Sequence, residues 1–218
     1  MTTHDNQHNP LSETPVPGKL VIISGPSGSG KSTILRQVMQ ICPLPLVFSV
    51  SATTRTPRPQ EQDGVHYYFL SPEKFQQKQA AGEFLECFEV YGKGYWYGTL
   101  WSEVQTNLER GQWVVLEIDV QGALEVLHHY PAAITIFVMP QDREVLETRL
   151  KARATESPEQ MARRLEAAHR ELDQADRYQY QVINDQVDRA VREICDILQK
   201  EAEPISDLQP GMEEHDAR

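Results

Sequence analysis

The chain has 218 residues and an ordinary globular composition, 39% hydrophobic and 24% charged, and this length allows one large domain with a hydrophobic core. Its formal net charge of -11 at pH 7 argues against a surface that coats nucleic acid, because proteins that track phosphate backbones carry a basic face. No apolar run approaches the length of a membrane span, so the sequence excludes a protein embedded in a bilayer.

The predicted elements begin after a polar leader. Residues 1–17 have no apolar periodicity and no features of a secretory signal, so we expect a disordered segment. The apolar run at 19–24 predicts a buried strand that ends at a glycine, and the helical spacing of apolar residues predicts a helix over 31–41. Ser71 and Pro72 then predict the start of a second helix.

The rest of the chain continues the alternation of strands and helices. The remaining predictions, in chain order, are a helix at 102–110, strands at 113–118 and 133–138, helices at 142–153 and from 158 onward, a strand at 181–184 and a helix at 187–200. This alternation predicts an α/β fold with a parallel sheet that is covered by helices on both faces. We expect the acidic segment 201–218 to be a disordered tail.

Cysteine usage indicates the compartment. Cys42, Cys87 and Cys195 are widely spaced and odd in number. They have neither the spacing of a metal site nor that of a disulfide framework, which suits a reducing environment. The sequence therefore predicts a cytoplasmic protein.

A phosphate-binding motif lies between the first predicted strand and helix. The segment Gly25 to Ser32 matches the pattern G-x-x-x-x-G-K-[ST]. Its glycines let backbone N–H groups converge on phosphate oxygens, and the helix N-terminus adds partial positive charge. Lys31 would reach the β- and γ-phosphates, and the Ser32 hydroxyl would bind Mg²⁺. The predicted ATP-binding residues are Gly25, Pro26, Ser27, Gly28, Ser29, Gly30, Lys31, Ser32 and Thr33.

Two carboxylates, Glu117 and Asp119, lie at the end of the predicted strand at 113–118. A carboxylate near the phosphate loop often helps to hold Mg²⁺. Residues that are two apart in a strand have side chains on the same face, so we expect these two carboxylates to point the same way. We predict Asp119 as the metal ligand that accompanies Ser32. Glu117 is a second candidate, and a solvated strand end is the alternative to both.

Two arginines lie together in the segment Ser51 to Pro59, with several hydroxyls, two prolines and no acid. Prolines stiffen the segment, so Arg55 and Arg58 can be displayed at low entropic cost. Guanidinium forks suit a phosphate dianion, and Tyr67 could donate its hydroxyl to the same anion. From the cluster alone, a solvated basic loop is an equal alternative.

Over roughly residues 18–200, the chain resembles guanylate kinases. The matching segments beyond the phosphate loop are Ser49-Val-Ser51, Thr53-Thr54-Arg55-x-Pro57-Arg58, Glu61-x-x-Gly64-x-x-Tyr67, Gly82-Glu-Phe-Leu-Glu86, Tyr97-Gly98-Thr99, Ile118-Asp119-Val-Gln-Gly122, Arg149 with Arg153, and Val182-Ile-Asn184-Asp185. The resemblance implies a P-loop kinase with a central parallel sheet flanked by helices, an inserted mixed α/β GMP-binding subdomain and a helical lid. It places the core at 18–49, 103–140 and 171–200, the GMP-binding subdomain at 50–102 and the lid at 141–170.

The resemblance also implies how GMP is held. The residues that match the phosphate site are Arg55, Arg58, Tyr67 and Tyr97, and those that match the base site are Ser51, Glu86, Thr99 and Asp119. Guanine offers two adjacent N–H donors, which a carboxylate such as Glu86 accepts, beside a carbonyl to which a hydroxyl donates. Adenine would leave that carboxylate without a partner, so strong discrimination against adenine is expected.

Three arginines match the lid that closes over ATP. The implied catalytic residues are Lys31, Arg149, Arg153 and Arg164, and the arginines would stabilise charge on the transferring phosphoryl group. Arg163 fits less well. Without the resemblance, this charged segment would be read as a solvated helix surface.

The chain departs from the family pattern in three places. The loop Gly92 to Gly98 is two residues longer than usual, so Tyr95 is an alternative to Tyr97. Ala152 and Ala154 stand where glycines are usual in the lid, and alanine restricts the backbone more than glycine does. Glu117 stands where aspartate is frequent.

The resemblance implies Mg²⁺-dependent transfer of the γ-phosphoryl group of ATP to GMP or dGMP, giving ADP and GDP. We expect a monomer or small homo-oligomer without nucleic-acid or membrane partners. One alternative is a non-catalytic guanylate-kinase-like module that binds a phosphopeptide, against which the intact Lys31 argues. Another is a kinase that acts on a different nucleotide or a sugar phosphate.

Overall fold

The computed structural model describes residues 18–89, 94–152 and 158–203. Its main sheet has five parallel strands in the order β2-β7-β1-β8-β9. These strands are β1 (Leu20–Ser24), β2 (Leu46–Phe48), β7 (Trp113–Glu117), β8 (Ile134–Pro140) and β9 (Tyr180–Asn184). The predicted α/β fold with a parallel sheet is confirmed.

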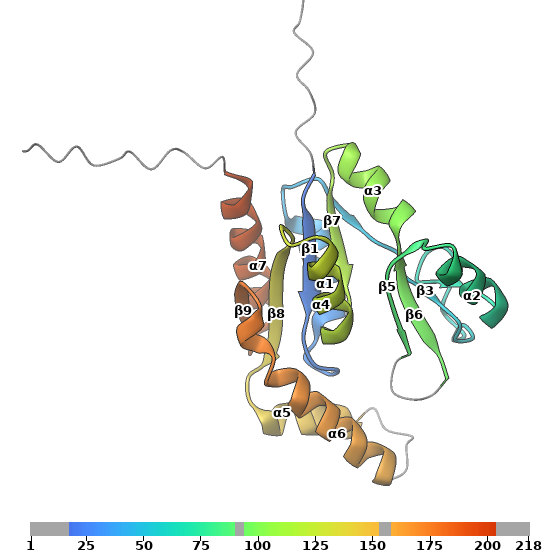
Figure 1. The fold of residues 1–218 in the computed structure, drawn as a ribbon. Coiled ribbons are helices and arrows are strands. Elements are labelled where there is room, and N and C mark those ends of the chain that lie inside the picture. Colours follow the sequence, from blue (N-terminus) through green and yellow to red (C-terminus); the bar gives the residue numbers. More distant parts are fainter. Residues whose placement is uncertain (1–17, 90–93, 153–157, 204–218) are drawn as a thin grey trace, which may run out of the picture.

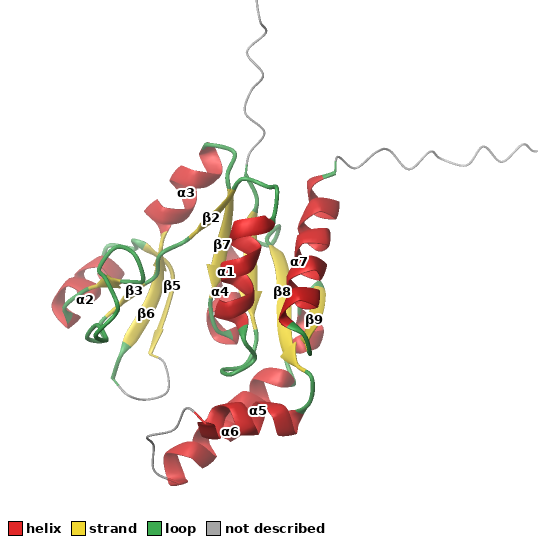
Figure 2. Cartoon of the chain, turned by 180° about the vertical axis from the view of Figure 1, so that it is seen from behind, coloured by secondary structure: helices red, strands yellow, loops and turns green. Residues whose placement is uncertain are grey.

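Helices cover both faces of this sheet, so the side chains of its central strand β1 are buried on both sides. Val21 and Ile23 of β1 pack in one hydrophobic cluster with α1 (Lys31–Ile41) and α7 (Val187–Ala202). Leu20 and Ile22, which point the other way, pack in a second cluster with α3 (Trp101–Glu109) and α4 (Val120–His129). Figures 1 and 2 show the two helical layers from opposite sides.

A second sheet has four strands in the order β4-β3-β6-β5, and it is inserted between β2 and α3. Its strands are β3 (Ala52–Thr53), β4 (Tyr68–Phe69), β5 (Phe84–Glu89) and β6 (Trp96–Leu100). The pairing is mixed, since β3 and β4 are parallel while β6 is antiparallel to both β3 and β5. This sheet lies to one side of the main sheet (Figure 1).

Helix α2 (Pro72–Ala80) packs on the second sheet through one aromatic contact. Ser71 caps its N-terminus, where the side chain accepts a hydrogen bond from the backbone N–H of Lys74 over 3.3 Å. Phe75 is fully buried and stacks on Phe84 of β5, with ring centroids 4.4 Å apart. The predicted cap at Ser71 is confirmed.

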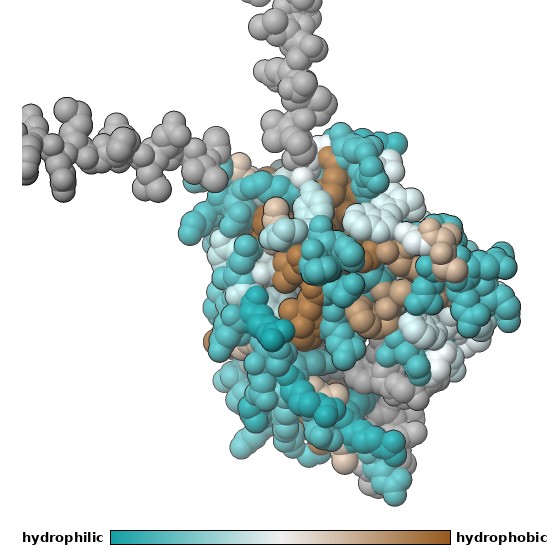
Figure 3. Space-filling view, viewed as in Figure 1, coloured by the Kyte–Doolittle hydropathy of each residue, from teal (hydrophilic) through white to brown (hydrophobic). Residues whose placement is uncertain are grey.

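Two further helices, α5 (Arg143–Ala152) and α6 (Pro158–Leu172), lie together beyond the carboxyl ends of the main-sheet strands (Figure 1). They share a small core in which Leu146, Leu150 and Ala168 are buried. The outer surface of this pair is hydrophilic (Figure 3). The described part of the chain contains no helix that is both long and apolar enough to cross a bilayer.

Sequence and structure differ at the end of β7. The strand stops at Glu117, and Asp119 is the N-cap of α4, where its side chain accepts a hydrogen bond from the Gly122 N–H over 2.8 Å. The expectation that Glu117 and Asp119 belong to one strand is therefore wrong. Helix α4 and strand β2 were not predicted. The remaining predicted helices and strands are found to within a few residues.

Candidate functional site

The loop between β1 and α1 is held in a shape that requires glycine. Gly30 has a φ of +96°, and a Cβ there would lie 2.3 Å from Nδ2 of Asn184, which itself donates to the Ser29 carbonyl over 2.7 Å. Gly25 has a φ of +138°, and a Cβ there would lie 2.3 Å from the Val138 carbonyl oxygen. The backbone angle disfavours a side chain at both positions; the Val138 backbone leaves no room for one at Gly25, and at Gly30 Asn184 would have to move.

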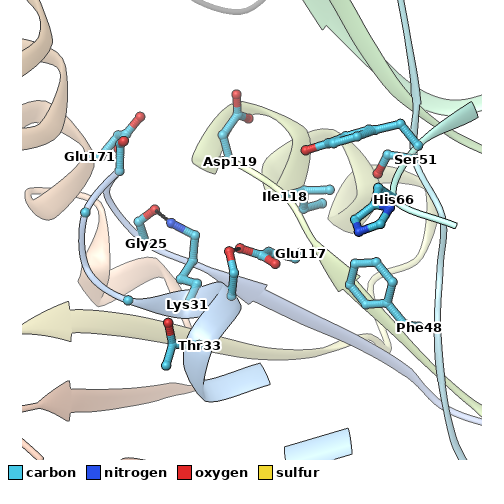
Figure 4. A pocket seen from close by; sticks show the side chains of 15 residues that line it. Gly25, Lys31, Thr33, Phe48, Ser51, His66, Glu117, Ile118, Asp119 and Glu171 are labelled. Atoms are coloured by element: carbon cyan, nitrogen blue, oxygen red, sulfur yellow. Dashed lines mark hydrogen bonds between the residues drawn. The ribbon is translucent and has the colours of Figure 1, made fainter. Parts of the chain in front are cut away.

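Positive charge gathers at the mouth of this loop. Gly30 is the N-cap of α1, and within the described structure no side chain caps this helix and no acidic residue lies in its first turn. The Lys31 ammonium donates to the carbonyl oxygens of Gly25 (2.5 Å) and Pro26 (3.0 Å), as Figure 4 shows for Gly25. An uncapped helix N-terminus beside an ammonium group is suited to binding an anion.

Glu117 is hydrogen-bonded to the residue that follows Lys31 at the start of α1. The Ser32 hydroxyl donates to Glu117 Oε1 over 2.6 Å, because the parallel pairing of β1 and β7 sets Glu117 beside Ile23. Asp119 instead uses Oδ1 to cap α4. Hydroxyl and carboxylate oxygens are ligands that Mg²⁺ accepts, together with waters and substrate phosphates.

A cavity of about 290 Å³ extends from this loop toward the second sheet. Phe48, Ser51 and His66 line the side opposite the loop, and Asp119 lies between the two sides (Figure 4). Tyr67 belongs to the same lining. A ligand in this cavity would therefore touch the phosphate loop at one end and the edge of the second sheet at the other.

Arg55 is the centre of a polar cluster in the second sheet. Its Nε donates to the Tyr97 hydroxyl over 3.1 Å, and its guanidinium group lies over the Tyr67 ring at 5.5 Å. Burial raises the pKa of Tyr67, so its hydroxyl stays protonated at neutral pH. Arg58 is exposed. Of the two tyrosines considered for this role, Tyr97 contacts Arg55, whereas Tyr95, which immediately precedes β6, is exposed.

Glu86 is buried at the other end of the second sheet. It is 7% exposed and accepts a hydrogen bond from the Thr99 hydroxyl over 2.6 Å. Desolvation raises the pKa of Glu86 to about 7, and the nearby charge of Asp119 acts in the same direction. Gly122 of α4 packs against this carboxylate, since a Cβ there would lie 3.2 Å from Glu86 Oε2 and 3.4 Å from Asp119 Oδ1.

Two arginines of the α5–α6 pair reach the phosphate loop. Arg149 donates to the Ser29 carbonyl over 3.4 Å, and Arg164 donates to the Ser27 hydroxyl over 3.2 Å. Arg163 is exposed. Arg153, predicted as a third catalytic arginine, lies outside the described residues, as does Ala154.

Comparison with known proteins identifies the family. The family model described as guanylate kinase matches residues 17–201. The chain is 53% identical to a guanylate kinase of Rhodopirellula baltica, with 89% of this chain and 94% of that protein covered. It is 44% identical to a guanylate kinase of Nitrosospira multiformis, with 86% and 88% covered. The chain belongs to the guanylate kinase family. The expected family and enzyme class, a nucleoside monophosphate kinase, are confirmed.

A solved guanylate kinase has the same fold. The crystal structure of guanylate kinase from Anaplasma phagocytophilum superposes with a TM-score of 0.72 at 28% identity, and the match covers 87% of this chain and 89% of that one. The central parallel sheet flanked by helices is therefore that of the guanylate kinase family.

Sequence reasoning missed four residues that line the cavity. Phe48, His66, Ile118 and Glu171 lie there beside the predicted residues Ser51, Tyr67 and Asp119. Four others of the predicted GMP set (Arg55, Glu86, Tyr97 and Thr99) lie in the two polar clusters behind the lining. Glu171 had no distinguishing signal, since it is one of many charged residues on α6. His66 could have been suspected, because it precedes Tyr67 in a matching segment.

Proposed function

We propose that this member of the guanylate kinase family transfers the γ-phosphoryl group of ATP to GMP across the cavity between the phosphate loop and the second sheet. The observation that carries the proposal is the continuity of this cavity. It joins a triphosphate loop with an intact Lys31 to a lining that contains Ser51, Tyr67 and Asp119. The donor and acceptor phosphates would therefore meet inside one continuous cavity.

In this proposal, the loop from Gly25 to Thr33 binds the phosphates of ATP. Its backbone N–H groups and the α1 N-terminus face the anion, and Lys31 exchanges the carbonyls of Gly25 and Pro26 for phosphate oxygens. Ser32 and Glu117 would hold Mg²⁺, since their oxygens lie 2.6 Å apart beside the loop. When bound, Mg²⁺ neutralises charge on the phosphates during transfer.

GMP would lie with its phosphate toward Arg55, Arg58, Tyr67 and Tyr97 and its base toward Ser51, Glu86, Thr99 and Asp119. The ionised Glu86 would accept from the two adjacent N–H groups of guanine, and the Ser51 hydroxyl would donate to the guanine carbonyl. Thr99 already orients Glu86 through its hydrogen bond. The guanidinium group of Arg55 also lies over the rings of Tyr67 and Phe69, 5.5 and 5.8 Å from their centroids.

Transfer needs no strong general base, because the acceptor oxygen of GMP is already an anion. That oxygen forms a bond to the γ-phosphorus while the bond from this phosphorus to the bridging oxygen breaks, and ADP leaves with the bonding electron pair. Arg149 and Arg164 lie at the loop and would stabilise charge on the transferring group. Closure of the α5–α6 pair would exclude water and suppress ATP hydrolysis.

A coupled assay of ADP release across nucleoside monophosphates tests this proposal. We expect release that requires Mg²⁺ and GMP and is at least roughly 10⁴-fold slower with AMP, since adenine has no N–H donors at the two positions where guanine presents them to the carboxylate. Lys31→Ala should abolish turnover while the circular dichroism spectrum stays unchanged. Equal rates with GMP and AMP, or normal turnover in Lys31→Ala, would contradict it. A cytoplasmic location and a monomer or small homo-oligomer remain predictions from the sequence.

A further inference from the structure

Arg55 has almost all of its hydrogen-bond donors occupied. A guanidinium group has five N–H donors. Nη1 donates to the Thr56 carbonyl (2.7 Å) and to Glu61 Oε2 (2.9 Å), Nη2 donates to Glu61 Oε1 (2.9 Å), and Nε donates to the Tyr97 hydroxyl (3.1 Å). These contacts with described residues use four donors, so one N–H of Nη2 has no acceptor in the part of the chain that the structure describes.

The occupied donors decide which edge of Arg55 can bind an anion. A guanidinium group offers two bidentate edges, a terminal edge formed by Nη1 and Nη2 and a side edge formed by Nε and Nη2. Glu61 covers the terminal edge with both of its oxygens. The remaining N–H of Nη2 lies on the side edge, next to the Nε–H that Tyr97 accepts. Only the side edge is therefore available to a phosphate.

Glu61 also fixes the backbone of the second arginine. Its Oε2 accepts the backbone N–H of Arg58 over 2.7 Å, so one carboxylate holds both members of the arginine pair. The side chains of Arg55 and Glu61 are only 12% and 15% exposed. The bond from Arg55 lowers the pKa of Glu61 to about 2, so the ion pair persists at any pH at which the enzyme is assayed.

We propose that Glu61 is a positioning residue that presents the side edge of Arg55, together with the Tyr97 hydroxyl, to the phosphate of GMP. The inference rests on the function proposed above and deepens it. Because Tyr97 is the acceptor in its bond with Nε, its own hydrogen is available for donation. The phosphate thus meets the remaining N–H of Arg55 Nη2 and the O–H of Tyr97 side by side, and Glu61 prevents the guanidinium group from rotating to present its terminal edge.

Glu61→Gln tests this role because it removes the charge and one of the two acceptor oxygens while keeping the size. We expect the KM for GMP to rise roughly ten-fold to a hundred-fold, as for a lost charge-assisted hydrogen bond. The KM for ATP should stay within about two-fold, and the ratio of GMP to AMP activity should not change, because Glu86 is untouched. Glu61→Asp keeps the charge but is too short to contact both arginines, so it should show a smaller rise and serves if Glu61→Gln folds poorly.

The matched control is Glu83→Gln, which removes another carboxylate of the same inserted segment. Glu83 pairs with Lys78 over 2.6 Å at an exposed site. We expect its KM values to equal those of the wild type, since an exposed ion pair contributes little.

A double-mutant cycle with Arg55→Ala separates positioning from a merely structural role. If Glu61 acts through Arg55, Glu61→Gln raises the KM for GMP much less once Arg55 is alanine than in the wild type, and the remainder reflects the bond to the Arg58 N–H. A rise as large as in the wild type would overturn the proposal, as would a normal or lowered KM for GMP in Glu61→Gln alone. A wild type that neither binds GMP in calorimetry nor phosphorylates it would overturn the proposed function instead, and this inference with it.

Discussion

The Thr99 hydroxyl donates to Glu86 Oε1 over 2.6 Å at a site where Glu86 is almost completely shielded from water. The bond favours the carboxylate, but desolvation outweighs it and the pKa of Glu86 rises to about 7. The proposed base-reading group is therefore half protonated near neutral pH. Its ionisation is coupled both to GMP binding and to the stability of the fold.

The first prediction concerns the pH dependence of GMP binding. Only the ionised Glu86 accepts from both N–H donors of guanine, so the KM for GMP should fall roughly ten-fold as the pH rises from 6 to 8. The phosphate of GMP also titrates near pH 6. In Glu86→Gln, only the titration of the GMP phosphate should change the KM for GMP with pH. The KM of the wild type should therefore depend more steeply on pH than that of the variant. Parallel profiles would remove Glu86 from base recognition.

The second prediction concerns stability. Because the pKa of Glu86 is higher in the folded state than the usual 4.5, the folded protein binds the extra proton, and the free energy of unfolding falls as the pH rises from about 4.5 to about 7. The loss is of the order of 3 kcal/mol at full ionisation. Glu86→Gln has no such loss, so it should be more stable than the wild type at pH 8 and nearly equal at pH 5. Urea denaturation at the two pH values measures the difference.

The third prediction assigns the Mg²⁺ requirement. Glu117→Gln should raise the Mg²⁺ concentration for half-maximal activity roughly ten-fold, because Glu117 is the carboxylate bonded to Ser32. Asp119→Asn preserves the cap of α4, since asparagine caps as well as aspartate, and should leave that concentration unchanged. The reverse pattern would support the assignment of Asp119 that the sequence suggested.

The fourth prediction tests the shape of the phosphate loop. Gly30→Ala should lower the free energy of unfolding by about 2 kcal/mol or more, because it combines a strained φ with a Cβ only 2.3 Å from Asn184. Gly82→Ala is the control, since Gly82 has a φ of +69° but a Cβ there would meet nothing within 4 Å. Its cost should be only the backbone strain, about 1 kcal/mol. Equal losses in the two variants would show that Asn184 can move aside.

Much of the fold follows from local patterns. Short apolar runs such as residues 19–24 identified four of the five strands of the main sheet, and capping residues such as Ser71 marked helix starts. Strand β2 was missed because it is only three residues long and half-buried. Helix α4 was missed because Asp119 was read as the end of a strand, when it is in fact a cap.

The candidate site could be predicted only where a motif has a fixed local geometry. The phosphate loop is such a motif, since its glycine angles and following helix are set within one segment. Glu117 contacts Ser32 whereas Asp119 caps α4, and this difference depends on the register between β1 and β7. The bond from Arg55 to Tyr97 and the approach of Glu171 to the loop join segments that are far apart in the chain. No local pattern specifies such contacts.

Residue 122 is already a glycine, and this limits how the space around Glu86 can be altered by mutation. Glu86 rests against the backbone of α4 there, so no shorter residue exists that would enlarge the space around the carboxylate. On this side of Glu86, further room can come only from a shift of the whole helix. Ala123 and Val126 of that helix are fully buried in the main core. Space gained on the α4 side of Glu86 thus requires the interior of the protein to be repacked at the same time.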